Sequence, residues 1–279
     1  MGNIMSKNIT PKVYIIGCSQ PDKEGIGEWL SELGVSHVSQ FKYVTAFNSP
    51  GDTLVELAGR RCYNSFEVGL NPNVTKIREN IADYIDNILA VRHGSVLRHV
   101  TYTFAIENVS RVFTAELNRH SIGTAISEGS LRYIRYTDIS WWIPHSIIPQ
   151  EGDSAKLLTQ KERTLIVFKR AFSQMEDNYR ELEEIWELGT DTTLTFAFKK
   201  ALTSLFRRII GMGVATGGVW TGNIEALRWI CEIRSEPHVE EEILYVVGLM
   251  LQQLKEKEPH LFGDFYLNEG FWRVKYSKV

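Results

Sequence analysis

A helical pattern of apolar residues runs unbroken over residues 155–187, and this stretch does most to limit the folds open to the chain. Large apolar side chains recur there every three to four positions with charged residues between them, as on an amphipathic helix. Similar spacing predicts further helices at about 192–210, 222–234 and 239–256. The second half of the chain is therefore predicted to be largely helical.

The first half mixes strands with helices. Residues 13–16 form an apolar run that predicts a short buried strand, and the strict alternation over 100–106 predicts a strand with one buried face. A turn at 71–73 precedes a helical pattern that runs to Gly94, and a second helical pattern covers 109–117. The chain is thus predicted to be α+β, with a mixed or antiparallel sheet.

We find no internal repeat, low-complexity tract or proline-rich linker in the 279 residues. The economical interpretation is a single domain over residues 1–279, with residues 1–12 flexible. A helical surface of this size often buries itself in oligomers. A glycine-bearing polar stretch up to about residue 50 lacks a sustained period, so its elements are not predicted.

Composition excludes several classes of protein. A formal net charge of −3 provides no long-range attraction for nucleic acid, so any anion must be held by local arginines. The sequence shows no signal peptide and no apolar run long enough to span a membrane, which predicts a cytoplasmic protein. Three cysteines without a CxxC spacing favour a reducing compartment over a disulfide framework.

Common nucleotide and metal motifs are missing. Residues 211–217 deviate from GxGxxG by one position, no GxxxxGK[ST] occurs, and the histidines show no zinc-binding spacing, so we predict no metal. Cys231 lies in an apolar helical segment and is predicted to be a small core residue. Cys62 follows two arginines, which could lower its pKa, or it could be buried beside Tyr63; we predict no covalent cysteine mechanism.

Asn223 and Arg234 are eleven residues apart in the predicted helix 222–234, a spacing that returns to nearly the same azimuth. An arginine among apolar neighbours on that face offers a bidentate fork for a carbonyl pair or a phosphate. The competing interpretations are a side chain that extends to water and a structural salt bridge with Glu232 or Glu236.

Residues 119–133 combine arginines, a histidine and a glutamate with two glycines and several small hydroxyl residues. Such a composition is typical of a loop whose backbone approaches a ligand closely. Arginines on a surface loop without a role are the competing interpretation.

Five ordered blocks of the sequence resemble the flavin-dependent (alternative) thymidylate synthases. The most specific corresponds to the family's Arg-His-Arg signature and its Ser-x-Arg-Tyr ending, and here reads Arg119-His120-Ser121 and then Ser130-Leu131-Arg132-Tyr133. The other four blocks begin at Leu54, His93, Arg207 and Thr221, and the last continues through Arg234 to His238. The resemblance covers about residues 50–262.

The resemblance implies a homotetramer that binds flavin adenine dinucleotide (FAD) between subunits, with deoxyuridylate (dUMP) stacked on the flavin. It also implies C5 methylation of dUMP to thymidylate (dTMP) without an enzyme cysteine, with methylenetetrahydrofolate and NADPH as co-substrates. By matching position, Arg234 would be the catalytic residue. The implied substrate-binding residues are Glu116, Arg119, Glu128, Gly129, Ser130, Leu131, Arg132, Arg207 and Arg234. The implied cofactor-binding residues are Ser95, Arg119, His120, Glu128, Asn223 and His238.

The sequence also departs from the family pattern. Ser121 replaces the last arginine of the signature, and Ser130 lies one residue farther from it than usual. Arg98 stands where a glutamate is common, Glu225 where an arginine often contacts the flavin, and Trp229 where a polar residue is common. The alternatives are therefore a diverged relative that methylates or hydroxymethylates another pyrimidine nucleotide, a catalytically silent flavin- or nucleotide-binding homologue, and a structural oligomer.

Overall fold

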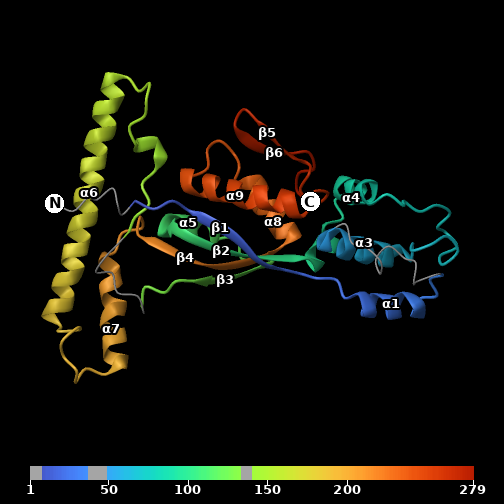
Figure 1. Ribbon diagram of the computed structural model, residues 1–279, viewed down its shortest axis with the longest axis horizontal. Helices are drawn as coiled ribbons and strands as arrows, with labels where there is room; N and C mark the ends of the chain where they lie inside the picture. The colour runs from blue at the N-terminus through green and yellow to red at the C-terminus, as the bar shows by residue number, and fades with distance from the viewer. Residues whose placement is uncertain (1–7, 37–48, 133–139) are drawn as a thin grey trace. The chain divides into compact units, whose positions relative to one another are not determined.

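The computed structural model describes residues 8–36, 49–132 and 140–279 (Figure 1). Four strands form one sheet in the order β1-β2-β4-β3: β1 (Lys12–Cys18), β2 (Thr101–Ser110), β3 (Thr124–Glu128) and β4 (Ala215–Asn223). A separate antiparallel hairpin joins β5 (Phe265–Asn268) to β6 (Phe271–Val274). Its turn has positive φ at Glu269 and Gly270, the conformation that the twist of a tight hairpin favours.

Eight α-helices are labelled in the described part of the chain, and they confirm the predicted helical second half. They are α1 (Lys23–Glu32), α3 (Pro50–Tyr63), α4 (Ile81–Ala90), α5 (Arg111–Leu117), α6 (Ala155–Ile185), α7 (Phe196–Phe206), α8 (Ile224–Ile233) and α9 (Glu241–Lys257). Short 3-10 helices cover Gly94–His99 (η3), His145–Ile147 (η4) and Arg207–Ile209 (η5). The fold is therefore α+β, as predicted.

The chain divides into two compact units. The first unit contains residues 106–119 and the described parts of 1–12 and 126–219. The second unit contains residues 120–125, 220–279 and the described part of 13–105. The single-domain extent over residues 1–279 stays a prediction.

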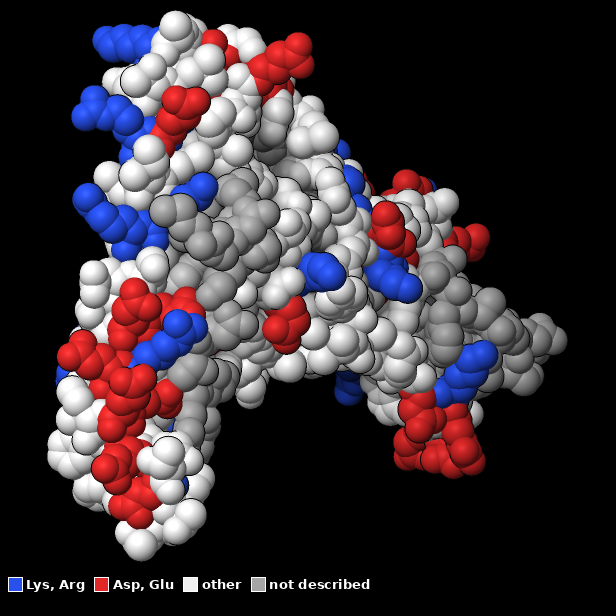
Figure 2. Space-filling view, turned by 60° about the vertical axis from the view of Figure 1, so that its left-hand side comes forward, with Lys and Arg blue, Asp and Glu red and all other residues white. Residues whose placement is uncertain are grey.

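The core of the first unit lies between α6 and α7, which run beside each other in Figure 1. Tyr179 of α6 is fully buried, and its ring meets that of Phe206 in α7 edge to face, with 6.1 Å between ring centroids. Trp141 stacks on Phe172 at 4.3 Å. Figure 2 shows acidic side chains gathered over the lower half of α6, where its sequence holds Glu176, Asp177, Glu181, Glu183 and Glu184.

In the second unit, α9 buries one apolar face completely, and a polar cluster lies at its C-terminal end. The Glu258 carboxylate accepts a hydrogen bond from the Gly51 amide at 3.0 Å and also from the hydroxyl groups of Ser49 and Tyr102. Asp52 contacts His260 Nδ1 at 2.6 Å. Burial raises the pKa of both carboxyl groups, which α3 and α9 hold together.

The helix predicted to run from Val74 to Gly94 begins later, at Ile81. The Asn80 side chain accepts from the Asp83 amide and caps that helix, while Arg60 donates to the carbonyl of Arg78. The hydrogen bond to the Arg78 carbonyl and the cap at Asn80 both favour a non-helical segment before Ile81. The part of the prediction that covers 74–80 is therefore wrong.

Two strands were not predicted, and residues 119–133 do not form a continuous loop. β3 occupies 124–128 with all five side chains at least partly exposed, and β4 contains adjacent glycines. At the other end of the chain, Ile9 donates to the Trp141 carbonyl at 3.0 Å within the expected flexible segment 1–12. None of the described helices is long and apolar enough to cross a lipid bilayer.

Candidate active site

Helix α8 begins at a capping asparagine that the sequence analysis assigned to cofactor binding. Asn223 Oδ1 accepts from the Ala226 amide at 2.9 Å, which satisfies one of the free N–H groups of the first turn. The Asn223 amide donates to the carbonyl of Gly123 at 3.0 Å. The N-terminal end of α8 is thereby joined to the segment 120–123.

The same segment reaches the C-terminal end of α8. Arg234 caps the helix, its amide donating to the Ile230 carbonyl at 2.9 Å, and its Nε donates to His120 Nε2 at 2.9 Å. Nε2 of His120 is the acceptor in this hydrogen bond, because an arginine Nε–H can only donate. Arg234, the assigned catalytic residue, and His120, an assigned flavin contact, are therefore direct partners.

The salt bridges considered for Arg234 involve other partners. Glu236 pairs with Arg273 at 2.7 Å, and Glu232 accepts from Ser277 and from the amide of Lys278. Arg234 is partly buried, so it does not simply extend into water. Its Nε contact with His120 fixes the direction of the guanidinium plane.

Gly123 lets the segment approach α8 closely. It has φ +74°, and a Cβ built on it would lie 2.6 Å from Asn223 Nδ2. Both the backbone conformation and the spacing favour glycine at this position. The sequence predicted this glycine in a loop whose backbone approaches a ligand. In the structure it lies against the capping Asn223.

A cavity of about 560 Å³ opens beside these residues, entirely within the second unit. Ile122 and Trp229 contribute apolar walls, Asn223 contributes an amide, and an ion pair between Arg98 and Glu225 lies at its edge. The volume and the mixture of apolar walls with few polar groups are typical of a small-molecule site. Ser95, in η3, and His238, after α8, are both exposed residues of the same unit.

In the first unit, Glu128 is held at the end of β3 by two side chains. Arg111 Nη1 contacts one carboxylate oxygen at 2.6 Å, and Asn118 Nδ2 donates to the other at 3.2 Å. Arg111 also donates to the carbonyl of Gly129, whose amide donates to the Gly217 carbonyl at 2.9 Å. Glu128 and Gly129 are therefore positioned by their protein neighbours.

The residues after Gly129 turn at once. Ser130 Oγ accepts from the Arg132 amide at 3.3 Å, and the Leu131 side chain packs against the core of the first unit. Arg132 is exposed. Tyr133, the end of the signature, lies outside the described residues.

The other assigned arginines of the first unit are on the surface. Arg119 is 71% exposed and lies 3.6 Å from Glu116, one helical turn earlier, whose carboxylate is 29% exposed. Arg207 follows α7 directly and is exposed. The structure thus places Glu116 and Arg119 together, and Arg207 at the end of another helix.

Comparison with known proteins assigns the chain to a family. The sequence profile described as "Thymidylate synthase complementing protein" matches residues 44–260. The chain is 32% identical over 234 residues to a probable flavin-dependent thymidylate synthase of Mycobacterium phage D29, an alignment that covers 84% of this chain and 90% of the relative. The chain belongs to the flavin-dependent thymidylate synthase family.

Other relatives agree with this assignment. A flavin-dependent thymidylate synthase of Mycobacteroides abscessus is 30% identical, with 77% of this chain and 80% of the relative covered. A crystal structure of the UMP/dUMP methylase PolB from Streptomyces cacaoi, bound with 5-Br UMP, matches with a TM-score of 0.57 and 16% identity. That match covers 91% of this chain and 92% of PolB, and it supports the fold.

Two departures from the flavin-dependent thymidylate synthase pattern contact each other. Arg98 and Glu225 form a two-pronged ion pair, in which Nη2 lies 3.0 Å from Oε1 and Nε contacts Oε2. Glu225 holds the pKa of Arg98 above its usual value by accepting these hydrogen bonds. The two residues that the sequence analysis singled out separately therefore form one ion pair.

Sequence reasoning missed several residues that shape these sites. Arg111 and Asn118 hold Glu128, yet no local motif marks them, because their role depends on strand pairing around β3. Trp229, noted in the sequence only as a departure from the family pattern, is 41% exposed and lines the cavity. Cys231 is fully buried, and burial raises the pKa of its thiol to about 12, which confirms the prediction of a core residue.

Proposed function

We propose that this protein methylates C5 of dUMP to give dTMP, using FAD, methylenetetrahydrofolate and NADPH. Family membership supports the reaction class. The observation that carries the assignment of roles is the contact between Arg234 Nε and His120 Nε2 at 2.9 Å, at the end of α8. When bound, the reduced flavin would supply hydride, with the folate providing the one-carbon unit and NADPH recharging the flavin.

The cavity beside α8 suits a flavin. Its apolar walls at Ile122, Ala226 and Trp229 match a planar aromatic ring system, and Asn223 offers hydrogen bonds at one edge. We assign Asn223, His120, Ser95 and His238 to flavin binding. Arg119 and Glu128 are further flavin contacts in this proposal.

Arg234 would act on the charge of the uracil ring. A guanidinium fork can donate to the carbonyl edge of uracil and stabilise the negative charge that develops when N3 loses its proton. This charge makes C5 nucleophilic. Because His120 already fixes the direction of Arg234, little reorganisation is needed at the moment of reaction.

The nucleotide phosphate would be held by three arginines and two backbone amides. We assign it to Arg119, Arg132 and Arg207, with the backbone amides of Ser130 and Leu131. The Gly129 amide donates to Gly217, so in this proposal Gly129 shapes the turn. Glu116 and Glu128 complete the substrate-binding set, with Glu128 held by Arg111 and Asn118.

We also propose that the protein assembles as a homotetramer. Several large apolar side chains of α6, α7 and the segments that follow them are exposed, notably Phe196 at 73%, Ile185 at 64% and Ile166 at 62%. Large apolar side chains exposed on two neighbouring helices support burial against other copies of the chain. Native mass spectrometry of the purified protein, compared with Phe196→Ser, tests it: a monomer in the wild type contradicts the assembly.

Product analysis tests the reaction. The purified protein is incubated with methylenetetrahydrofolate, NADPH and either dUMP or UMP, and the products are identified by mass spectrometry. Formation of dTMP is expected. A hydroxymethylated base, or turnover of UMP alone, would replace this proposal by the diverged relative that Ser121 and the longer loop suggested. Flavin binding without any turnover would indicate the silent homologue.

A further inference from the structure

Residues 275–279 follow the β5–β6 hairpin and end at the cavity beside α8. Lys278 and Val279 both line this cavity, and Val279 is only 8% exposed. A Cβ built on Gly94 would lie 2.6 Å from Glu225 Oε1 and 3.5 Å from the carbonyl carbon of Val279. The segment therefore meets the cavity where η3 and Glu225 also meet it.

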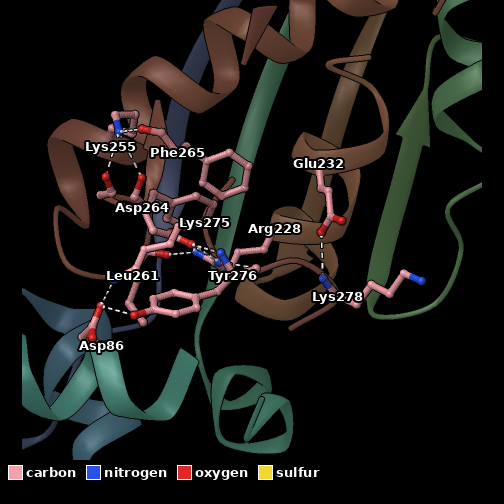
Figure 3. Close-up of polar contacts among 12 residues, drawn as sticks. Asp86, Arg228, Glu232, Lys255, Leu261, Asp264, Phe265, Lys275, Tyr276 and Lys278 are labelled. Atoms are coloured by element: carbon pink, nitrogen blue, oxygen red, sulfur yellow. Dashed lines mark hydrogen bonds and ion pairs between the residues drawn. The ribbon is translucent and has the colours of Figure 1, made fainter. Parts of the chain in front are cut away.

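The end of the segment is held by one glutamate. Glu232 accepts from Ser277 Oγ at 2.6 Å with one oxygen and from the Lys278 amide at 2.9 Å with the other. Figure 3 shows Glu232 reaching down from α8 to Lys278, whose ammonium group points away from the carboxylate. The contact thus fixes the backbone just before Val279.

The beginning of the segment is held by two aspartates. Asp86 of α4 accepts from the Tyr276 hydroxyl at 2.7 Å and from Lys275 Nζ at 3.2 Å. Asp264 accepts from the Tyr276 amide at 3.3 Å and is itself gripped by Arg228, at 2.7 and 2.8 Å (Figure 3). Arg228 is 2% exposed, so this anchor is a buried, two-pronged ion pair.

Glu232 lies on the part of α8 that faces the cavity. It follows Glu225 by seven residues and Trp229 by three, a spacing that places side chains on one face of a helix. The helix that supplies part of the cavity wall therefore also holds the segment that supplies Lys278 and Val279 to it. Each hydrogen bond of Glu232 acts on main chain or hydroxyl groups next to the cavity.

We propose that Lys278 and Val279 form a fixed wall of the flavin cavity and that Glu232 is the positioning residue that holds this wall in place. The inference rests on the assignment of the cavity to the flavin ring system. An apolar Val279 opposite an aromatic ligand excludes water from one side of it. Release of the wall would expose that side and would weaken flavin binding.

Flavin titration of the flavin-free protein tests the inference. Glu232→Ala should weaken FAD binding about 10-fold, or about 1.4 kcal/mol, because the released wall exposes one side of the ligand to water. Quenching of flavin fluorescence measures this affinity. Glu232→Gln keeps one acceptor oxygen and should fall between the alanine variant and the wild type. The matched control is Glu236→Gln, which removes a neighbouring ion pair with Arg273 and should bind FAD like the wild type.

Two further measurements separate positioning from general destabilisation. Hydrogen exchange of the flavin-free protein should accelerate at residues 276–279 in Glu232→Ala and stay unchanged there in the control. Val279→Gly leaves the Glu232 bonds intact and should weaken FAD binding several-fold, which keeps the test usable even where Glu232→Ala folds poorly.

Equal FAD affinity in Glu232→Ala, Val279→Gly and the wild type would overturn this inference while leaving the proposed function intact. A wild-type protein that binds no FAD would overturn both.

Discussion

The two groups of assigned residues differ in how firmly the protein holds them. At α8, Arg234 donates to His120 and Asn223 is joined to Gly123, so both ends of the helix are tied to one short segment. In the first unit, Arg119 is 71% exposed, and Arg132 and Arg207 are exposed as well. Groups that act on developing charge gain from being oriented in advance, whereas surface arginines can close on a phosphate when it arrives.

The largest effect is expected at the firmly held group. Arg234→Ala should lower kcat by about 100- to 1,000-fold, the usual cost of losing one oriented donor to developing charge. Flavin binding should persist, because Asn223 and the apolar walls remain. Steady-state turnover with dUMP, together with the flavin absorbance of the purified variant, measures both.

Arg234→Lys sharpens this test. A lysine keeps the positive charge but lacks the planar fork, so its kcat should recover only part of the loss. Equal activity of the lysine variant and the wild type would show that charge alone suffices, and the proposed uracil grip would be wrong.

Arg207→Ala probes the loosely held group and should act on ground-state binding. We expect a KM for dUMP about 10- to 100-fold higher with kcat nearly unchanged, because a charged hydrogen bond contributes about 1.5–3 kcal/mol. Its neighbour offers a matched control: Arg208 donates to the Ser204 carbonyl at 3.0 Å, and Arg208→Ala should leave KM close to the wild-type value. A large drop in kcat for Arg207→Ala would contradict the contrast between the two groups.

The elements that periodicity predicted are those that bury an apolar face. In β2 the buried side chains alternate with less buried ones, and in α6 they recur at helical spacing. The hydrophobic pattern therefore revealed both elements. β3 leaves no such trace, since its side chains are all at least partly exposed and its place at the sheet edge depends on main-chain pairing. β4 was missed because its paired glycines interrupt any alternation.

The candidate site shows the same limit. The sequence predicted Asn223 and Arg234 within one helix, but they are the two caps that flank α8, and their partners come from residues 120–123. Arg98 and Glu225 are 127 positions apart, and each looked like an isolated departure. Only the fold reveals that they form one pair.

A pair of glycines tests how much the tight approach at α8 contributes. Gly123→Ala should destabilise the protein by about 2–3 kcal/mol, from a left-handed backbone conformation that costs about 1–2 and a disturbed helix cap that costs about 1. Gly152, in the first unit, also has positive φ, +92°, but nothing lies within 4 Å of its built Cβ. Gly152→Ala should therefore show the backbone cost alone in urea unfolding.

Flavin affinity separates the two variants further. Gly123→Ala pushes on Asn223 Nδ2, 2.6 Å from the new Cβ, so FAD binding should weaken with stability. Gly152→Ala should bind FAD normally. Similar losses of affinity in both would mean that the α8 group is no more sensitive to its surroundings than a distant turn.

The smallest effect is expected from the exchanged charges at the cavity edge. Arg98 is 62% exposed and Glu225 27%, so water and salt screen their attraction, and the pair should contribute mostly to orientation. Arg98→Glu alone places two carboxylates together and Glu225→Arg alone places two cations together; each should lower the melting temperature slightly. The double variant restores a pair in the opposite sense and should regain much of that loss. Because the screening length falls to about 3 Å at 1 M salt, the single variants should approach the wild type there.

The FAD affinity of the double variant tests whether the direction of the pair matters. An unchanged affinity would make Arg98 and Glu225 a structural pair, whereas a changed affinity despite restored stability would place the Glu225 carboxylate in contact with the cofactor.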